Sequence, residues 1–169
     1  MLRLNVYFEP NKNLMSSDAC WDCVAVMNFV RIGGKRIYAL PVYSLVQCDG
    51  SYSARQSFAA AAYLITDPTG ATLMGKRVDI AAISSTETEW ASVYHGLEAA
   101  LELDQECIQI ENDCLSVVAG LVHPTNPLKH VYARHYRKKI QELAAGSAWT
   151  GIRWIPRKLN KADALFRLK

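Results

Sequence analysis

The strongest constraint on the fold is the order of β-prone and helix-prone segments between residues 43 and 168. Three β-prone runs follow one another at 43–49, 58–66 and 71–78, and the turn sequence Asp-Pro-Thr-Gly joins the second to the third. The pattern then becomes helix, strand, helix, helix, strand and helix, at residues 87–103, 107–112, 114–121, 128–145, 151–156 and 160–168. This order predicts an α/β fold with a mixed sheet, in which the first strands pair antiparallel and the later strands join through helical crossovers.

The two longest predicted helices are amphipathic. In residues 87–103, one face carries the apolar stripe Trp90, Tyr94, Leu97 and Leu101. In residues 128–145, the inward positions are Tyr132, Tyr136, Ile140 and Leu143, and the outward positions include Arg134, Lys138 and Lys139. We expect Gly146 to end this second helix.

The first 42 residues differ from the rest of the chain. They are β-rich, with two β-prone runs around a Gly-Gly turn, so we predict an N-terminal extension at 1–42 and a main domain at 43–169. Cys20-Trp-Asp-Cys23 is a lone CxxC without a second pair at zinc-ribbon spacing. We interpret the cysteines as buried or incidental thiols, and the extension as a structural element that covers a sheet edge.

Charge is distributed unevenly along the chain. From Lys129 onward there are eleven basic residues and two acidic ones, although the formal net charge of the whole chain is only +3. An acidic front and a basic back suit a protein that holds cations in one place and phosphates in another, and a solvated helix face is the alternative. The chain has no apolar run of about 18 residues and no signal-peptide pattern, so we expect no membrane partner and a cytoplasmic location.

Four carboxylates lie at the boundaries of predicted elements, and each has a simple structural explanation. Asp49 is followed by glycine, which is typical of a turn. Glu89 can form a capping box with Thr86. Asp113 can cap the following helix, and Asp163 stands near a helix start, where the helix dipole favours negative charge.

Together, the four carboxylates suggest chemistry. The carboxyl ends of adjacent parallel strands meet at one edge of a sheet, and ligands collect there. Several carboxylates in one pocket repel one another unless a cation is present, and Mg²⁺ or Mn²⁺ prefers such oxygen ligands. Two such ions can activate a water and stabilise the leaving oxygen in phosphodiester cleavage.

The sequence resembles type 1 ribonuclease H and its shorter reverse-transcriptase-like relatives over residues 43–169. The resemblance rests on "CDGS", "ETEWASVYHGLEAAL", "IQIENDCLSVV" and "WIPRKLNKADAL", in this order and on these elements. It implies a five-stranded mixed sheet flanked by helices, with Asp49, Glu89, Asp113 and Asp163 as catalytic residues that hold two Mg²⁺ or Mn²⁺ ions. It also implies an endonuclease that cleaves the RNA strand of an RNA–DNA hybrid and leaves 3′-hydroxyl and 5′-phosphate ends.

The resemblance also implies a substrate-binding set: Gly50, Ser51, Ser85, Thr86, Arg157, Lys158 and Asn160. Many relatives carry a histidine in the loop before the last aspartate, whereas the loop here is "PRKLNKA", so no catalytic histidine is assigned. The interval from Asn160 to Asp163 is one residue shorter than in the family, which corresponds to about 100° of rotation on an α-helix.

Two alternatives stay open at this point. One is a catalytically weak or inactive module of the same fold that binds nucleic acid or a protein partner. The other is a nuclease of this fold that acts on DNA. The sequence does not indicate an oligomeric state.

Overall fold

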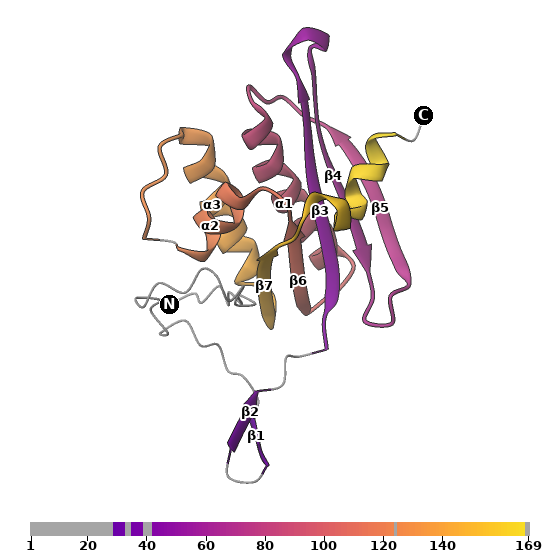
Figure 1. The fold of residues 1–169 in the computed structure, drawn as a ribbon, viewed down its shortest axis with the longest axis vertical. Coiled ribbons are helices and arrows are strands. Elements are labelled where there is room, and N and C mark those ends of the chain that lie inside the picture. The colour runs from indigo at the N-terminus through magenta and orange to yellow at the C-terminus, as the bar shows by residue number, and fades with distance from the viewer. Residues whose placement is uncertain (1–28, 33–34, 39–41, 124, 168–169) are drawn as a thin grey trace.

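The computed structural model describes residues 29–32, 35–38, 42–123 and 125–167. The main domain contains five strands: β3 (Ser44–Ser53), β4 (Phe58–Thr66), β5 (Thr72–Asp79), β6 (Cys107–Asn112) and β7 (Trp149–Trp154). Its helices are α1 (Ser85–Glu102), α2 (Leu115–Val122) and α3 (Val131–Ala144), with short 3₁₀ turns at η1 (Ala54–Gln56), η2 (Arg157–Leu159) and η3 (Lys161–Phe166). Figure 1 shows these elements in one compact body.

The five strands form one mixed sheet in the order β5-β4-β3-β6-β7. The strands β3, β4 and β5 pair antiparallel, whereas β3, β6 and β7 pair parallel. Parallel neighbours need crossover connections. The helix α1 lies in the connection from β3 to β6, and α2 and α3 lie in the connection from β6 to β7. The predicted mixed sheet with an antiparallel first half is therefore confirmed.

The main core lies between the sheet and the helices. From α1, Trp90 and Leu97 are fully buried, as the apolar stripe predicted, and they join Val46 of β3 and Ile110 of β6 in one cluster. Tyr94 and Leu101 complete the stripe as half-buried residues against the same cluster. Local periodicity thus identified the buried face of α1 correctly.

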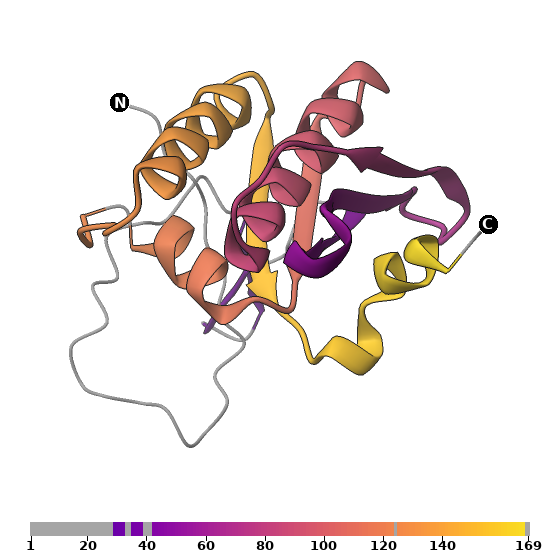
Figure 2. The same ribbon diagram turned by 90° about the horizontal axis from the view of Figure 1, so that it is seen from above.

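The C-terminal turn η3 covers the opposite face of the sheet. Leu165 lies close to Gly75 of β5 and beside Leu64 of β4. Because successive side chains of a strand point to opposite faces, Leu64 lies on the face of the sheet opposite to the core residues Tyr63 and Ile65. Figure 2 shows the C-terminal turns set apart from the three α-helices. The predicted last helix is therefore present as a short 3₁₀ turn that packs on the sheet.

The N-terminal extension is described only in part. Strands β1 (Phe29–Ile32) and β2 (Lys35–Tyr38) pair antiparallel as a separate two-stranded sheet, in agreement with the predicted hairpin strands. The Cys20-Trp-Asp-Cys23 motif and the rest of the predicted extension lie outside the described residues. In the described part of the chain, no helix is long and apolar enough to span a membrane.

Candidate metal centre

Three carboxylates from three different parts of the chain meet where the parallel pairing of β3 with β6 ends. Asp49 belongs to β3, Glu89 lies near the start of α1, and Asp113 directly follows β6. One oxygen of each lies within 4.8 Å of the other two. The donors are all carboxylate oxygens, which suit Mg²⁺ or Mn²⁺ better than soft metals. These residues, the acidic cluster, fit a divalent cation.

Asp49 lies inside a strand, so the interpretation of Asp49-Gly50 as a turn is wrong. Asp49 pairs with Ala62 of β4, and β3 continues through Gly50. The Asp49 side chain is almost fully buried, with 3% exposed. A Cβ at Gly50 would lie 2.5 Å from the backbone nitrogen of Glu89. Glycine at this position therefore allows α1 to approach β3 closely enough to bring Glu89 beside Asp49.

Glu89 does not cap its helix, which corrects the capping box predicted with Thr86. The N-cap is Ser84, whose Oγ accepts a hydrogen bond from the Glu87 amide at 3.2 Å. Glu87 Oε2 accepts one from the Ile83 amide at 2.8 Å. The capping interactions therefore lie two residues earlier than predicted, and the Glu89 carboxylate reaches the acidic cluster instead.

Asp113 does not cap α2 either, so this structural explanation is also wrong. The N-cap position belongs to Cys114, whose amide donates to Asn112 Oδ1 at 2.8 Å. Asp113 Oδ1 accepts a hydrogen bond from Asn160 Nδ2 at 3.2 Å, and its backbone carbonyl accepts one from Trp154 Nε1 at 2.9 Å. Neighbouring segments thus hold both the side chain and the backbone of Asp113.

Two buried asparagines position the acidic cluster. Asn112 Nδ2 donates to Glu89 Oε2 at 2.9 Å and to the Cys48 carbonyl at 3.1 Å. Asn160 Nδ2 donates to the same carbonyl at 2.8 Å, besides its bond to Asp113. Asn160, predicted as a substrate contact, is thus engaged inside the protein. Asn112 was not predicted, although a polar residue at the end of the predicted strand "CIQIEN" was a usable signal.

Burial raises the pKa of two carboxylates of the acidic cluster, Asp49 and Glu89. Burial, with the nearby Asp113 and Asp163 charges, raises the pKa of Asp49 from 3.8 to about 6. Burial also raises the pKa of Glu89 from 4.5 to about 8, and the charges of Asp49 and Asp113 add to this rise, although the Asn112 hydrogen bond opposes it. A cation in the cluster would favour the ionised carboxylates, so the electrostatics also fit a metal site.

Asp163 stands apart from the other three carboxylates. Its Oδ1 accepts a hydrogen bond from Arg157 at 3.1 Å, and its Oδ2 accepts one from Arg167 at 2.5 Å. These arginines, Arg157 first, hold the pKa of Asp163 below its usual value. Its charge still raises the pKa of Asp49. The structure therefore places Asp163 near the cluster but in an ion pair, and its role as a fourth metal ligand stays a prediction.

A fifth carboxylate, Glu111, is buried near the cluster but serves the sheet. It forms an ion pair with Arg153 of β7, whose Nε lies 2.8 Å from Glu111 Oε1. Gln47 Nε2 donates to its other oxygen at 2.7 Å. These partners compensate the buried charge across three adjacent strands. Its neighbours in the sequence did not indicate this role.

The other predicted substrate-binding residues lie on β3, α1 and η2. Ser51 follows Gly50 in β3, and Ser85 and Thr86 form the first turn of α1. Arg157 and Lys158 are exposed in η2. Contact of these residues with substrate stays a prediction.

The basic face of α3 is partly committed to internal contacts. Arg134 and Arg137 donate to carbonyl oxygens of the preceding loop at 2.6, 3.0 and 2.9 Å. Lys139 lies over the ring of Tyr94, 5.1 Å from its centre, instead of pointing outward as predicted. These residues therefore stabilise the loop and the packing of α3 on α1.

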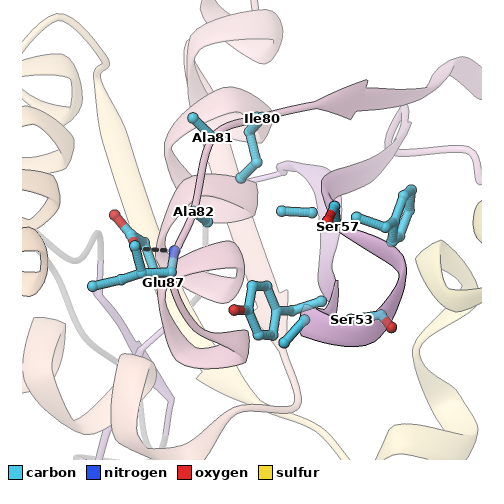
Figure 3. Close-up of a pocket in the computed structure, with 11 residues that line it drawn as sticks. Ser53, Ser57, Ile80, Ala81, Ala82 and Glu87 are labelled. Carbon is cyan, nitrogen blue, oxygen red and sulfur yellow. Dashed lines mark hydrogen bonds between the residues drawn. The ribbon is translucent and has the colours of Figure 1, made fainter.

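An open pocket of about 470 Å³ lies beside the start of α1. Side chains from the end of β3, from η1, from the start of β4 and from the β5–α1 loop line it (Figure 3). Tyr52, Phe58 and Ile83 give it a largely apolar wall, and Glu87 is its only charged lining residue. Because no basic residue lines this pocket, it suits the uncharged parts of a ligand better than a phosphate.

Comparisons with known proteins agree with this architecture. The chain aligns over 72% of its length with ribonuclease H1 of the halophilic archaeon Halobacterium salinarum, at 23% identity and a TM-score of 0.67, covering 92% of that protein. It aligns over 73% with the N-terminal ribonuclease H domain of a Mycobacterium tuberculosis protein, at 21% identity and a TM-score of 0.67, covering 90% of that chain. A third structure, LC11 ribonuclease H1 in complex with an RNA/DNA hybrid, shows 19% identity and a TM-score of 0.64, with 72% and 92% covered.

No curated protein matches the chain. The sequence model described as "Reverse transcriptase-like" matches residues 47–166, which span most of the main domain and contain all four predicted carboxylates. The solved structures establish the fold around the acidic cluster. The chain therefore belongs to the reverse transcriptase-like family and has the ribonuclease H fold.

Proposed function

We propose that this protein is an endonuclease that depends on Mg²⁺ or Mn²⁺ and hydrolyses the RNA strand of RNA–DNA hybrids. The observation that carries this proposal is the meeting of Asp49, Glu89 and Asp113 within 4.8 Å, from three elements of a ribonuclease H fold. The similar LC11 enzyme was solved with an RNA/DNA hybrid, which supports the choice of substrate.

The acidic cluster would hold two divalent ions between Asp49, Glu89 and Asp113. When bound, such ions supply activation of a water and stabilisation of the leaving oxygen. Asn112 orients Glu89, and Asn160 orients Asp113, through the hydrogen bonds described above. The raised pKa of Glu89, about 8, favours its protonated form at neutral pH without a cation, and a bound cation would favour the ionised carboxylate.

The surroundings of the cluster suit a nucleic acid. The Gly50 and Ser51 backbone would contact 2′-hydroxyl groups, which distinguish RNA from DNA. Ser85 and Thr86 would contact the hybrid. Arg157 and Lys158 are exposed cations of η2, and Arg157 is near enough to lower the pKa of Asp49. Both would contact phosphates.

A cleavage assay tests the proposal. A hybrid labelled on its RNA strand is incubated with the protein and Mg²⁺ or Mn²⁺, and the expected products carry 3′-hydroxyl and 5′-phosphate ends. Asp49→Asn should lower the rate by about 100-fold or more, because a buried ligand is lost. Asp79→Asn is the matched control, since Asp79 is an exposed carboxylate on β5. Cleavage that survives Asp49→Asn would contradict the proposed site.

A second candidate is a binding module with weak or no catalysis. The ion pairs of Asp163 with Arg157 and Arg167 favour this candidate, because they engage the carboxylate that the resemblance to ribonuclease H implies as a metal ligand. Hybrid binding without cleavage in either metal would select this candidate. Duplex DNA and duplex RNA, assayed beside the hybrid, separate a DNA nuclease from a hybrid nuclease.

A further inference from the structure

An exposed tryptophan lies directly beside the acidic cluster. Trp154 is the last residue of β7, where it pairs with Asn112 of β6, and 44% of its surface is exposed. Its Nε1 donates to the backbone carbonyl of Asp113 at 2.9 Å. The hydrogen bond fixes the ring next to a residue of the cluster, while a large apolar surface stays open to solvent.

Exposed apolar and cationic residues lie close to Trp154 and Asp113 in the sequence. Leu115, two residues after Asp113, and Leu159 of η2 are also exposed. Arg157 and Lys158 lie between Trp154 and Leu159 in the sequence and are exposed as well. An aromatic face followed by exposed cations is the combination by which proteins hold single-stranded nucleic acid, with the bases on the ring and the phosphates on the cations.

A fixed aromatic ring can distinguish paired from unpaired nucleotides. Inside a continuous duplex, each base stacks between its neighbours, so its flat faces are not available to a protein ring. An unpaired base next to a duplex offers a free face. Stacking of one base on an aromatic side chain corresponds to roughly 5- to 140-fold in affinity.

We propose that Trp154 is a substrate-positioning residue that stacks on an unpaired nucleobase next to the phosphodiester at the acidic cluster. This inference rests on the proposed function and narrows the substrate to hybrids that carry an unpaired nucleotide, such as a junction with a single-stranded extension. The ring sets the position of the strand, and the exposed cations of η2 contact its phosphates.

The test compares Trp154→Phe with Trp154→Leu, because both lose the N–H donor to Asp113 and only the first keeps an aromatic face. Binding is measured in EDTA, which prevents metal-dependent cleavage, with a blunt hybrid and with the same hybrid extended by unpaired nucleotides. For the extended hybrid, Trp154→Leu should weaken binding roughly 5-fold or more relative to Trp154→Phe. For the blunt hybrid, the two variants should bind equally. Leu73→Ala, an exposed apolar residue on the far edge strand β5, is the matched control.

Equal binding of the two variants to the extended hybrid would overturn the proposal, because the ring face would then contribute nothing. Equal weakening on both hybrids would also overturn it. A fluorescence measurement covers the case in which Trp154→Leu fails to fold. The extended hybrid should quench the fluorescence of the wild-type protein more than that of Trp154→Phe, and equal quenching would contradict stacking. These readouts do not use cleavage, so stacking without cleavage would refute the proposed activity and leave Trp154 as a base-binding residue.

Discussion

Glu89→Gln tests whether ionisation of the buried Glu89 carboxylate lowers the stability of the fold when no metal is bound. Burial is the main reason that the pKa of Glu89 rises from 4.5 to about 8. Because this folded-state pKa lies above the unfolded value, the unfolded chain releases its proton first as the pH rises. The contribution of Glu89 to the free energy of unfolding is therefore fully present below about pH 4 and is lost progressively as the pH rises to about 8. Glutamine keeps the shape of the protonated side chain and cannot ionise, so the variant escapes this loss.

The size of the effect follows from the pKa of Glu89. A rise from 4.5 to about 8, at 1.36 kcal/mol per unit, corresponds to about 5 kcal/mol. Solvent screening of this partly buried side chain reduces the expectation to about 3–5 kcal/mol. Urea denaturation in EDTA measures the free energy of unfolding at about pH 5, 7 and 8.5. Relative to wild type, Glu89→Gln should gain less than about 1 kcal/mol at pH 5 and about 3–5 kcal/mol at pH 8.5.

The refuting result is a difference between Glu89→Gln and wild type that stays constant or shrinks as the pH rises. Glu142→Gln is the control, since Glu142 is an exposed carboxylate on α3 outside the cluster, and its effect should stay within about 1 kcal/mol at each pH. Millimolar Mg²⁺ should stabilise wild type at high pH, because a cation favours the ionised cluster.

Three further experiments test the packing around the site. Ser84→Ala should lower the free energy of unfolding by about 1 kcal/mol and Thr86→Ala should change it little, because Ser84 caps α1; equal effects in thermal unfolding would contradict the assigned cap. Gly50→Ala should cost about 3 kcal/mol in urea denaturation, since the new Cβ would lie 2.5 Å from the α1 backbone, and an unchanged midpoint would refute that contact. Arg153→Met should lower the free energy of unfolding by about 3–5 kcal/mol, because Glu111 loses its charged partner. Adding Glu111→Gln should recover part of this loss, and no recovery would contradict a coupled ion pair.

Local patterns in the sequence were sufficient for the main elements. Strands β4 and β6 have the predicted bounds, and α1 differs from its prediction by two residues at its start and one at its end. Alternation and helical periodicity reflect which side of an element is buried, so they can be read from neighbouring residues. The same patterns placed Asp49, Glu89 and Asp113 at boundaries that the parallel strands then brought together.

Cap and turn assignments failed where several local signals competed. Thr86 and Ser84 are both good N-cap residues, and in the structure Ser84 takes the N-cap position, so α1 begins at Ser85. Asp49-Gly50 is a turn signal, but pairing with β4 keeps both residues in an extended strand. For Asp49-Gly50, pairing with a distant strand outweighs the local turn preference.

Neighbouring residues in the sequence were enough to predict the order of the elements, the mixed sheet and the three carboxylates of the acidic cluster. How these carboxylates are held depends on the folded chain, because their partners are far away in the sequence. Asn160 reaches the carbonyl of Cys48, 112 residues earlier, and Asn112 reaches Glu89 across 23 residues. Likewise, the ion pairs of Asp163 and the exposed ring of Trp154 depend on where η2, η3 and β7 end in space. Side-chain contacts of this kind arise from three-dimensional packing, which local periodicity does not encode.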